Sequence, residues 1–141
     1  MSVTAVTHIN LRGTARQALE FYHSVFGGQI AMITYKDAGN VRDPSDADHL
    51  MWGQVDSNNG FRVMAYDVPV ATPWNQGENA YFVSVRGDSA QEISAHWAKL
   101  SEGAKIVQPL APAQWTALYG MLKDRFGVVW VLDVVAQYNA S

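Results

Sequence analysis

The chain has 141 residues, of which 48% are hydrophobic and 16% charged, the composition of a folded globular protein and not of a disordered one. Its net charge is −3 and its Lys and Arg residues form no long cluster, so neither nucleic acid nor an anionic membrane surface is an expected partner. It has no cysteine, which excludes disulfides, thiol nucleophiles and cysteine-ligated metal sites.

The N-terminal residues carry no basic-then-apolar leader, and no apolar run approaches the roughly 18 residues of a transmembrane helix. We therefore expect a cytoplasmic protein without a membrane partner. Five Trp and six Tyr are many for this length, and aromatic side chains make effective binding surfaces.

The first half of the chain has the signals of four strands and one helix. The alternating segment VTHINL is followed by a helical pattern at about residues 14–26, with Thr14 as the expected cap and apolar residues at spacings of three and four. Strand signals follow in GQIAMITY, HLMWGQV and FRVMAYD, the last two joined by the turn DSNNG. The predicted order is βαβββ.

A polar loop, KDAGNVRDPSDAD, occupies residues 36–48 of this first half. Its aspartates lack the glycine and the terminal glutamate of an EF-hand calcium loop, so we expect a solvated acidic loop, with His49 solvated behind it.

The second half repeats the first. Residues 69–78 are the predicted linker, in which Trp74 is either an anchor across a dimer interface or a ligand contact. A helix is predicted at 88–101 with Asp88 as its cap, after the strand AYFVSV and before AKIVQPL, WTALYGMLKD and VVWVLDV. The helical segments align at an offset of 74 residues, which matches Arg12 with Arg86. Trp97 and Trp130 are expected in the core.

These elements predict one α+β domain, residues 1–141, with βαβββ modules at about 1–68 and 79–136. The modules are expected to be related by pseudo-twofold symmetry and to form a curved mixed sheet around a cleft, with the helices on the outer face. Strand alternation places Ile9 and Leu11 under the first helix and His8 and Asn10 on the opposite face. The other sets expected to share a face are Leu50, Trp52 and Gln54; Ala80 and Phe82; and Val129, Val131 and Asp133.

Three motifs spread over residues 5–135 carry a resemblance to a known family: RGTARQALEFYHSVFGGQI, MWGQV ahead of VMAYD, and QWTALYGMLKDRFGVVWVLDV. The chain resembles the vicinal oxygen chelate superfamily, which includes glyoxalase I, extradiol dioxygenases and bleomycin-resistance proteins, and within it the PhnB-like branch. The resemblance implies paired βαβββ modules and a homodimer.

The resemblance also implies four inward-facing positions that hold a divalent metal in enzymes of the superfamily. Carried onto this sequence, they fall at His8, Trp52, Ala80 and Val131. Indole and alkyl groups do not coordinate such metals, and a site needs about three to six nitrogen or oxygen ligands. We therefore predict no metal and no cofactor, with a shifted two-ligand site at His8 and Asp133 as the alternative.

Two functions follow from these observations. The preferred hypothesis is a small-molecule-binding protein of the glyoxalase/bleomycin-resistance type, which sequesters a hydrophobic or aromatic ligand in the cleft between the sheets. No catalytic residue is assigned, and His8 is as readily a hydrogen-bonded strand histidine as a ligand contact. The alternative is a metal-dependent lyase, isomerase or dioxygenase that retains a degenerate site around His8 and Asp133. The candidate ligand-binding residues are His8, Asn10, Trp52, Gln54, Trp115 and Tyr119.

Overall fold

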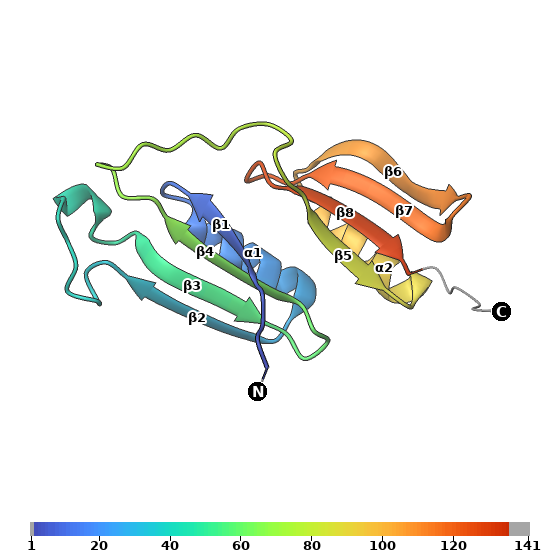
Figure 1. The fold of residues 1–141 in the computed structure, drawn as a ribbon, viewed down its shortest axis with the longest axis horizontal. Helices are drawn as coiled ribbons and strands as arrows, with labels where there is room; N and C mark the ends of the chain where they lie inside the picture. The colour runs from blue at the N-terminus through green and yellow to red at the C-terminus, as the bar shows by residue number, and fades with distance from the viewer. Residues whose placement is uncertain (1, 136–141) are drawn as a thin grey trace. The chain divides into compact units, whose positions relative to one another are not determined.

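The computed structural model describes residues 2–135, and the chain divides into two compact units between Gly77 and Glu78 (Figure 1). Each unit has the predicted βαβββ order. The elements of the first are β1 (Thr7–Leu11), α1 (Ala15–Phe26), β2 (Gln29–Thr34), the short 3-10 helix η1 (Pro44–Asp46), β3 (Leu50–Asp56) and β4 (Arg62–Asp67). Those of the second are β5 (Val83–Gly87), α2 (Ala90–Leu100), β6 (Lys105–Ala113), β7 (Thr116–Lys123) and β8 (Val129–Val134).

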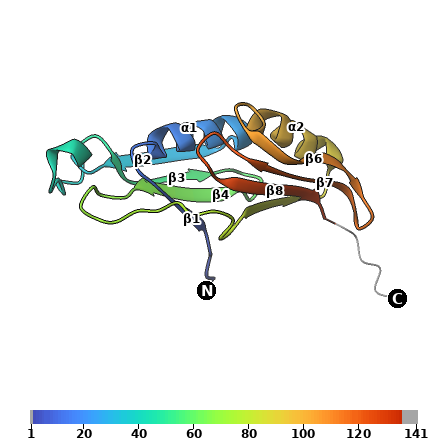
Figure 2. The same cartoon turned by 90° about the horizontal axis from the view of Figure 1, so that it is seen from above.

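Each unit contains one four-stranded mixed sheet. The strand orders are β1-β4-β3-β2 and β5-β8-β7-β6, with the first and last strands of each unit parallel and the other pairs antiparallel. Figure 2 shows one helix against one face of each sheet. The predicted α+β class with two βαβββ modules is confirmed, and the curved sheet around a shared cleft stays a prediction. Residue 136, the predicted end of the second module, lies outside the described residues.

The apolar stripe of α1 packs on the first sheet as predicted. Its buried members are Ala15, Ala18, Leu19, Tyr22, Val25 and Phe26. Contact with β3 is close at Gly53, where an added Cβ atom would lie 2.3 Å from Cδ1 of Leu19. Glycine at this position therefore lets the helix and the strand approach each other.

The start of α1 is held by a residue far away in the sequence. Thr14 occupies the N-cap position as predicted, but its side chain makes no cap hydrogen bond. Instead, Oδ1 of Asp67, at the end of β4, accepts hydrogen bonds from the backbone N–H of Gly13 at 2.7 Å and of Ala15 at 3.0 Å. In α2 the cap is Ser89 and not Asp88, because the Ser89 side chain accepts the backbone N–H of Glu92.

The core of the second unit is built around Trp130, which is fully buried and whose Nε1 donates to Oδ2 of Asp124 at 2.8 Å. The other oxygen of Asp124 accepts the backbone N–H of Phe126 and Val128, which closes the turn before β8. Trp97 is half-buried and packs against Gly120, where an added Cβ atom would lie 2.8 Å from its ring. The expected core position holds fully for Trp130 and in part for Trp97.

The strand registers correct the sequence alignment of the two modules. Val68 donates its backbone N–H to the carbonyl oxygen of Leu11, and Val135 does the same to Gly87. These are matching positions at the ends of parallel pairs. Leu11 and Gly87 are 76 residues apart and not 74, whereas Val68 and Val135 are 67 residues apart. Arg12 follows β1 whereas Arg86 lies inside β5, so the two arginines are not equivalent. The predicted strand AYFVSV is also too long, since β5 begins at Val83.

The predicted linker folds back on the first unit. Nη2 of Arg12 donates hydrogen bonds to the carbonyl oxygens of Pro69 and Thr72, and its guanidinium lies 5.8 Å from the ring centre of Trp74. Nε1 of Trp74 donates to the carbonyl oxygen of Asn10 at 3.0 Å. Trp74 is therefore an anchor within its own module. Within residues 2–135, neither helix is long and apolar enough to span a bilayer.

Candidate functional site

The structure brings four of the six candidate ligand-binding residues onto one face of the first sheet. Cross-strand pairing runs from His8 to Met64 and from Met64 to Gln54, so their side chains share a face. Asn10 on β1 and Trp52 on β3 follow at alternate positions. This face lies opposite α1, because the residues between them on β1, Ile9 and Leu11, are buried. We call it the open face of the first sheet.

Trp115 and Tyr119, the other two candidates, lie together in the second unit. Their rings meet edge to face with centres 5.5 Å apart, and Trp115 is 62% exposed. Tyr119 on β7 pairs with Asp133 on β8, whose carboxylate accepts hydrogen bonds from Arg86. The two residues form an aromatic pair of their own, in which Trp115 is exposed and Tyr119 is half-buried.

His8 is already engaged on the open face. Its Nδ1 lies 3.0 Å from Oδ1 of Asn10, and its ring meets the ring of Tyr66 edge to face with centres 5.3 Å apart. In the neutral tautomer that donates from Nδ1 to Asn10, Nε2 is left as an acceptor. His8 is thus a hydrogen-bonded strand histidine that still has one ring nitrogen to offer.

A β-bulge at the start of β3 changes the predicted faces. The pairing of β2 with β3 passes from Trp52 directly to Leu50 and skips Met51. Leu50 is fully buried, and its Cδ1 lies 3.3 Å from the Cβ position of Gly53, which itself contacts α1. The prediction that Leu50 shares a face with Trp52 is therefore wrong, because the extra residue reverses the alternation.

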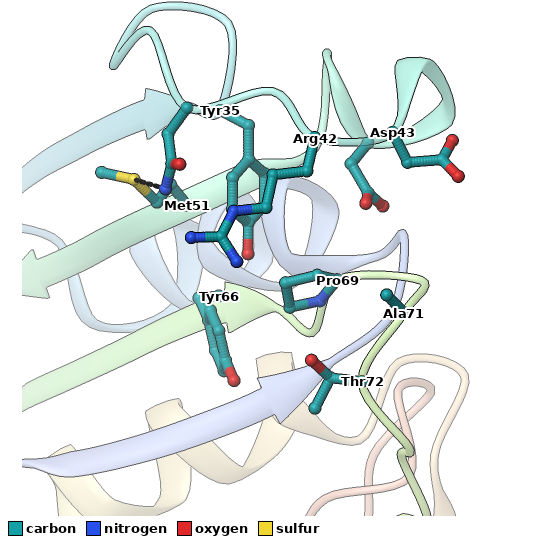
Figure 3. A pocket seen from close by; sticks show the side chains of 10 residues that line it. Tyr35, Arg42, Asp43, Met51, Tyr66, Pro69, Ala71 and Thr72 are labelled. Carbon is teal, nitrogen blue, oxygen red and sulfur yellow. Dashed lines mark hydrogen bonds between the residues drawn. The ribbon is translucent and has the colours of Figure 1, made fainter.

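A pocket of about 530 Å³ lies at the end of the first sheet where β3 begins and β4 ends. That volume is within the range of small-molecule sites. Figure 3 shows Met51 and Tyr66 on its sheet side and Arg42 reaching toward both of them from the loop. Its lining residues are Tyr35, Asn40, Arg42, Asp43, Asp46, Met51, Tyr66, Pro69, Ala71 and Thr72. None of the six predicted residues lines it, although Trp52 follows Met51 and Asn10 pairs with Tyr66.

The loop at residues 36–48 forms one wall of this pocket and is ordered by its own contacts. Its ends are joined by a hydrogen bond of 3.0 Å from the backbone N–H of Lys36 to the carbonyl oxygen of Ala47. The carboxylate of Asp46 is buried, accepts the backbone N–H of Val70 and lies 3.6 Å from Nδ1 of His49. The expectation of a solvated loop is wrong for Asp46, because this carboxylate ties the loop to the segment after β4.

Hydrogen bonds inside the loop and burial set the pKa values at the pocket. The side-chain hydroxyl and backbone N–H of Ser45 both donate to Asp43, which lowers the pKa of the Asp43 carboxyl. Burial raises the pKa of Tyr35, and the negative charges of Asp46 and Asp67 add to the effect. Tyr35 therefore stays neutral, and its hydroxyl donates to the carbonyl oxygen of Asp67 at 2.7 Å.

The residues at the superfamily's metal-binding positions do not fit a divalent ion. Module equivalence makes Met64 on β4 the counterpart of Val131, and Ser84 on β5 the counterpart of His8. Ala80, the position first expected, lies before β5. The four positions implied by the resemblance contain one imidazole, that of His8, and no carboxylate. The structural counterparts Met64 and Ser84 add neither an imidazole nor a carboxylate. Among residues 2–135 no group of three or more His, Asp or Glu side chains could hold a metal ion.

Asp133 does not complete a site either. Nε of Arg86 lies 3.1 Å from its Oδ1, and the carboxylate is mostly buried beside this partner. A metal ligand at Asp133 would have to replace that ion pair.

Sequence reasoning missed three pocket residues, Arg42, Met51 and Tyr66. Arg42 belongs to a loop without periodicity, and Met51 is the bulged residue that alternation cannot place. Tyr66 could have been found, since it has the same parity on β4 as Met64 and faces the side of the sheet opposite Ala65.

Comparison with known proteins gives the family. The sequence profile of the glyoxalase/bleomycin resistance protein/dioxygenase superfamily matches residues 6–132. The structure of protein PA1353 from Pseudomonas aeruginosa is similar with a TM-score of 0.82 and 32% identity, over 94% of this chain and 98% of that one. The PhnB protein from Bacillus cereus has the same fold, with a TM-score of 0.75 and 23% identity over 94% and 100% of the chains. No curated protein matches. The chain therefore belongs to the glyoxalase/bleomycin resistance protein/dioxygenase superfamily.

Proposed function

We propose that this protein binds a small, largely apolar or aromatic molecule and sequesters it without changing it chemically. The observation that carries the proposal is the pocket of about 530 Å³ between the loop at 36–48 and the open face of the first sheet. Its sheet side offers the Met51 thioether and the Tyr66 ring. Such surfaces bind flat apolar groups by stacking and by exclusion of water.

Trp52 extends this apolar surface along β3. It is half-exposed on the open face, and Gln54 follows on the same face with an amide that could orient a ligand. We propose that the ligand reaches from the pocket onto Trp52. His8 and Asn10 supply polar contacts at the other side of Tyr66.

Trp115 and Tyr119 remain proposed ligand contacts in the second unit. Their edge-to-face pair leaves most of the Trp115 indole uncovered, which is unusual for so large an apolar group.

The ionisable groups at the pocket and on the open face favour binding over catalysis. General acid–base work needs a carboxylate or imidazole within reach of the bound molecule. Among the pocket carboxylates, Asp43 is hydrogen-bonded by Ser45 and Asp46 by Val70. His8 is the remaining candidate base on the open face, and no set of metal ligands surrounds it in the described part of the chain.

Fluorescence titration with N-phenyl-1-naphthylamine, a neutral aromatic probe, tests the proposal. Truncating a central aromatic anchor costs about 2 kcal/mol or more, so Trp52→Ala should weaken binding at least about tenfold and leave the protein folded. Trp97→Ala is the matched control, because Trp97 packs on Gly120 under α2 and its loss should lower the melting temperature and not the affinity. No binding by the parent protein, or equal binding by Trp52→Ala, would contradict the proposal.

A further inference from the structure

We propose that the pocket selects a ligand with a single negative charge, such as an aromatic carboxylate, and that Arg42 binds this group. The inference rests on the proposed function, since it specifies the ligand of the same pocket. It adds a charged recognition residue to a site otherwise described by its apolar surface.

Arg42 is the cation among the residues that line the pocket. Its side chain makes no ion pair or hydrogen bond with any residue in the range 2–135, although Asp43 and Asp46 lie in the same lining. In Figure 3 its guanidinium extends toward Met51 and Tyr66, whereas the carboxylate of Asp43 points away from it at the far end of the pocket. The fork of donors on Arg42 is therefore available to a ligand.

The two carboxylates of the lining are engaged by the protein itself. Asp43 accepts two hydrogen bonds from Ser45, at 2.9 and 2.7 Å. Asp46 is buried, and both of its oxygens lie within 3.3 Å of the backbone N–H of Val70. Both bonds from Ser45 go to Oδ1 of Asp43, and in Figure 3 the Asp43 carboxylate points away from Arg42. The guanidinium of Arg42 has no such partner among residues 2–135, so the part of the pocket near Met51 and Tyr66 is suited to an acceptor.

Tyr66 provides a second donor. Its hydroxyl makes no hydrogen bond with the described residues, and in Figure 3 it lies on the Thr72 side of the pocket. Tyr35 cannot take this role, because its hydroxyl donates to the carbonyl oxygen of Asp67. Arg42 and the Tyr66 hydroxyl are thus two donors that line the same pocket, and a guanidinium binds a carboxylate or a sulfonate well.

The charge of the lining limits the ligand to one negative charge. One arginine and two aspartates leave the pocket with a net charge of −1. A single guanidinium can neutralise a monoanion, but a dianion such as a phosphate monoester would be repelled by both carboxylates. The apolar part of the ligand then lies on Met51 and the ring of Tyr66, with Pro69 opposite.

Two fluorescent probes that share one ring system test this. They are 8-anilinonaphthalene-1-sulfonate, a monoanion, and N-phenyl-1-naphthylamine, which lacks only the sulfonate. Arg42→Gln should weaken binding of the anionic probe about tenfold, the size expected for loss of a charged hydrogen bond, and leave the neutral probe within about twofold. Added NaCl should weaken binding of the anion by the parent protein far more than by Arg42→Gln.

Arg16→Gln is the control. Arg16 lies on α1, away from the open face, and its replacement changes the net charge by the same amount. Tyr66→Phe, which removes only the hydroxyl, should weaken binding of the anionic probe by a smaller factor than Arg42→Gln does. Thermal melts of each variant check that the fold is intact.

The outcomes separate the two proposals. Failure of the parent protein to bind either probe overturns the proposed function and this inference together. Binding of the neutral probe that depends on Trp52, with no effect of Arg42→Gln on the anion, overturns the inference alone. If Arg42→Gln and Arg16→Gln weaken binding of the anionic probe equally, the inference is also overturned, because the effect would then be one of overall charge.

Discussion

The carboxylate of Asp67, at the end of β4, accepts a hydrogen bond of 3.0 Å from the backbone N–H of Ala15, the first residue of α1. The two residues are 52 positions apart in the sequence. The same carboxylate accepts the N–H of Gly13 and, through Oδ2, that of Leu50 at the start of β3. One side chain, 2% exposed, therefore joins the helix, β3 and β4 at the end of the sheet that carries the pocket.

Replacing this carboxylate should destabilise the first unit strongly. In Asp67→Asn one acceptor oxygen becomes an NH₂ group that faces backbone N–H donors, so we expect a loss of about 2–4 kcal/mol in the free energy of unfolding. Urea denaturation measures it. Asp48→Asn, an exposed aspartate in the same unit, is the control and should stay within about 0.5 kcal/mol of the parent. A loss of the same small size in both variants would contradict the role of Asp67.

The parts of the fold that repeat with a regular period could be predicted from the sequence. The stripe of α1 and the alternation of His8, Ile9, Asn10 and Leu11 on β1 are local patterns, and the structure reproduces them. The hydrogen-bond acceptor at the start of α1 could not be predicted, because Asp67 reaches it only after β4 has paired with β1.

The pocket could not be predicted from the periodicity of apolar residues, because it depends on two features that this periodicity does not reveal. The bulge at Met51 inserts one residue into β3, so alternation read through it assigns Leu50 to the wrong face. The loop at 36–48 lies over the sheet because Asp46 binds Val70, a contact between two segments that both appear as polar connections in the sequence. Arg42 lies in that loop and belongs to no motif that the sequence analysis could recognise.

The protein should hold no divalent metal after desalting. The positions His8, Trp52, Ala80 and Val131, or their structural counterparts Met64 and Ser84, provide one strong ligand. Elemental analysis of the purified protein measures the metal content. Stoichiometric zinc, nickel, iron or manganese that is lost in His8→Ala, and retained in a His96→Ala control, would instead support the enzyme alternative.

We propose a homodimer in solution. Among the described strands, β6 pairs only with β7 and exposes Ile106 at 42% and Val107 at 52%. An uncovered apolar edge strand promotes association unless another chain covers it. Light scattering at micromolar concentration should give twice the chain mass of 15.5 kDa, and a mass of one chain across a dilution series would contradict the dimer.

The stability of the first unit should fall at high pH because of Tyr35. Burial raises the pKa of Tyr35 above its ordinary value of about 10, so the folded state favours the neutral hydroxyl that donates to the carbonyl oxygen of Asp67. This contribution is fully present below pH 10 and is lost as the pH rises through the higher pKa of the folded state, because the unfolded chain ionises first.

Tyr35→Phe isolates this effect. Below pH 10 the variant should lose about 1 kcal/mol of unfolding free energy with its hydrogen bond, and the difference from the parent should shrink as the pH rises to about 11. Urea unfolding at a series of pH values measures both. Tyr81→Phe, which removes a hydroxyl from a side chain that is 53% exposed, is the control variant. A parent and a Tyr35→Phe variant with parallel pH profiles would show that the neutral hydroxyl of Tyr35 contributes nothing to the alkaline limit of stability.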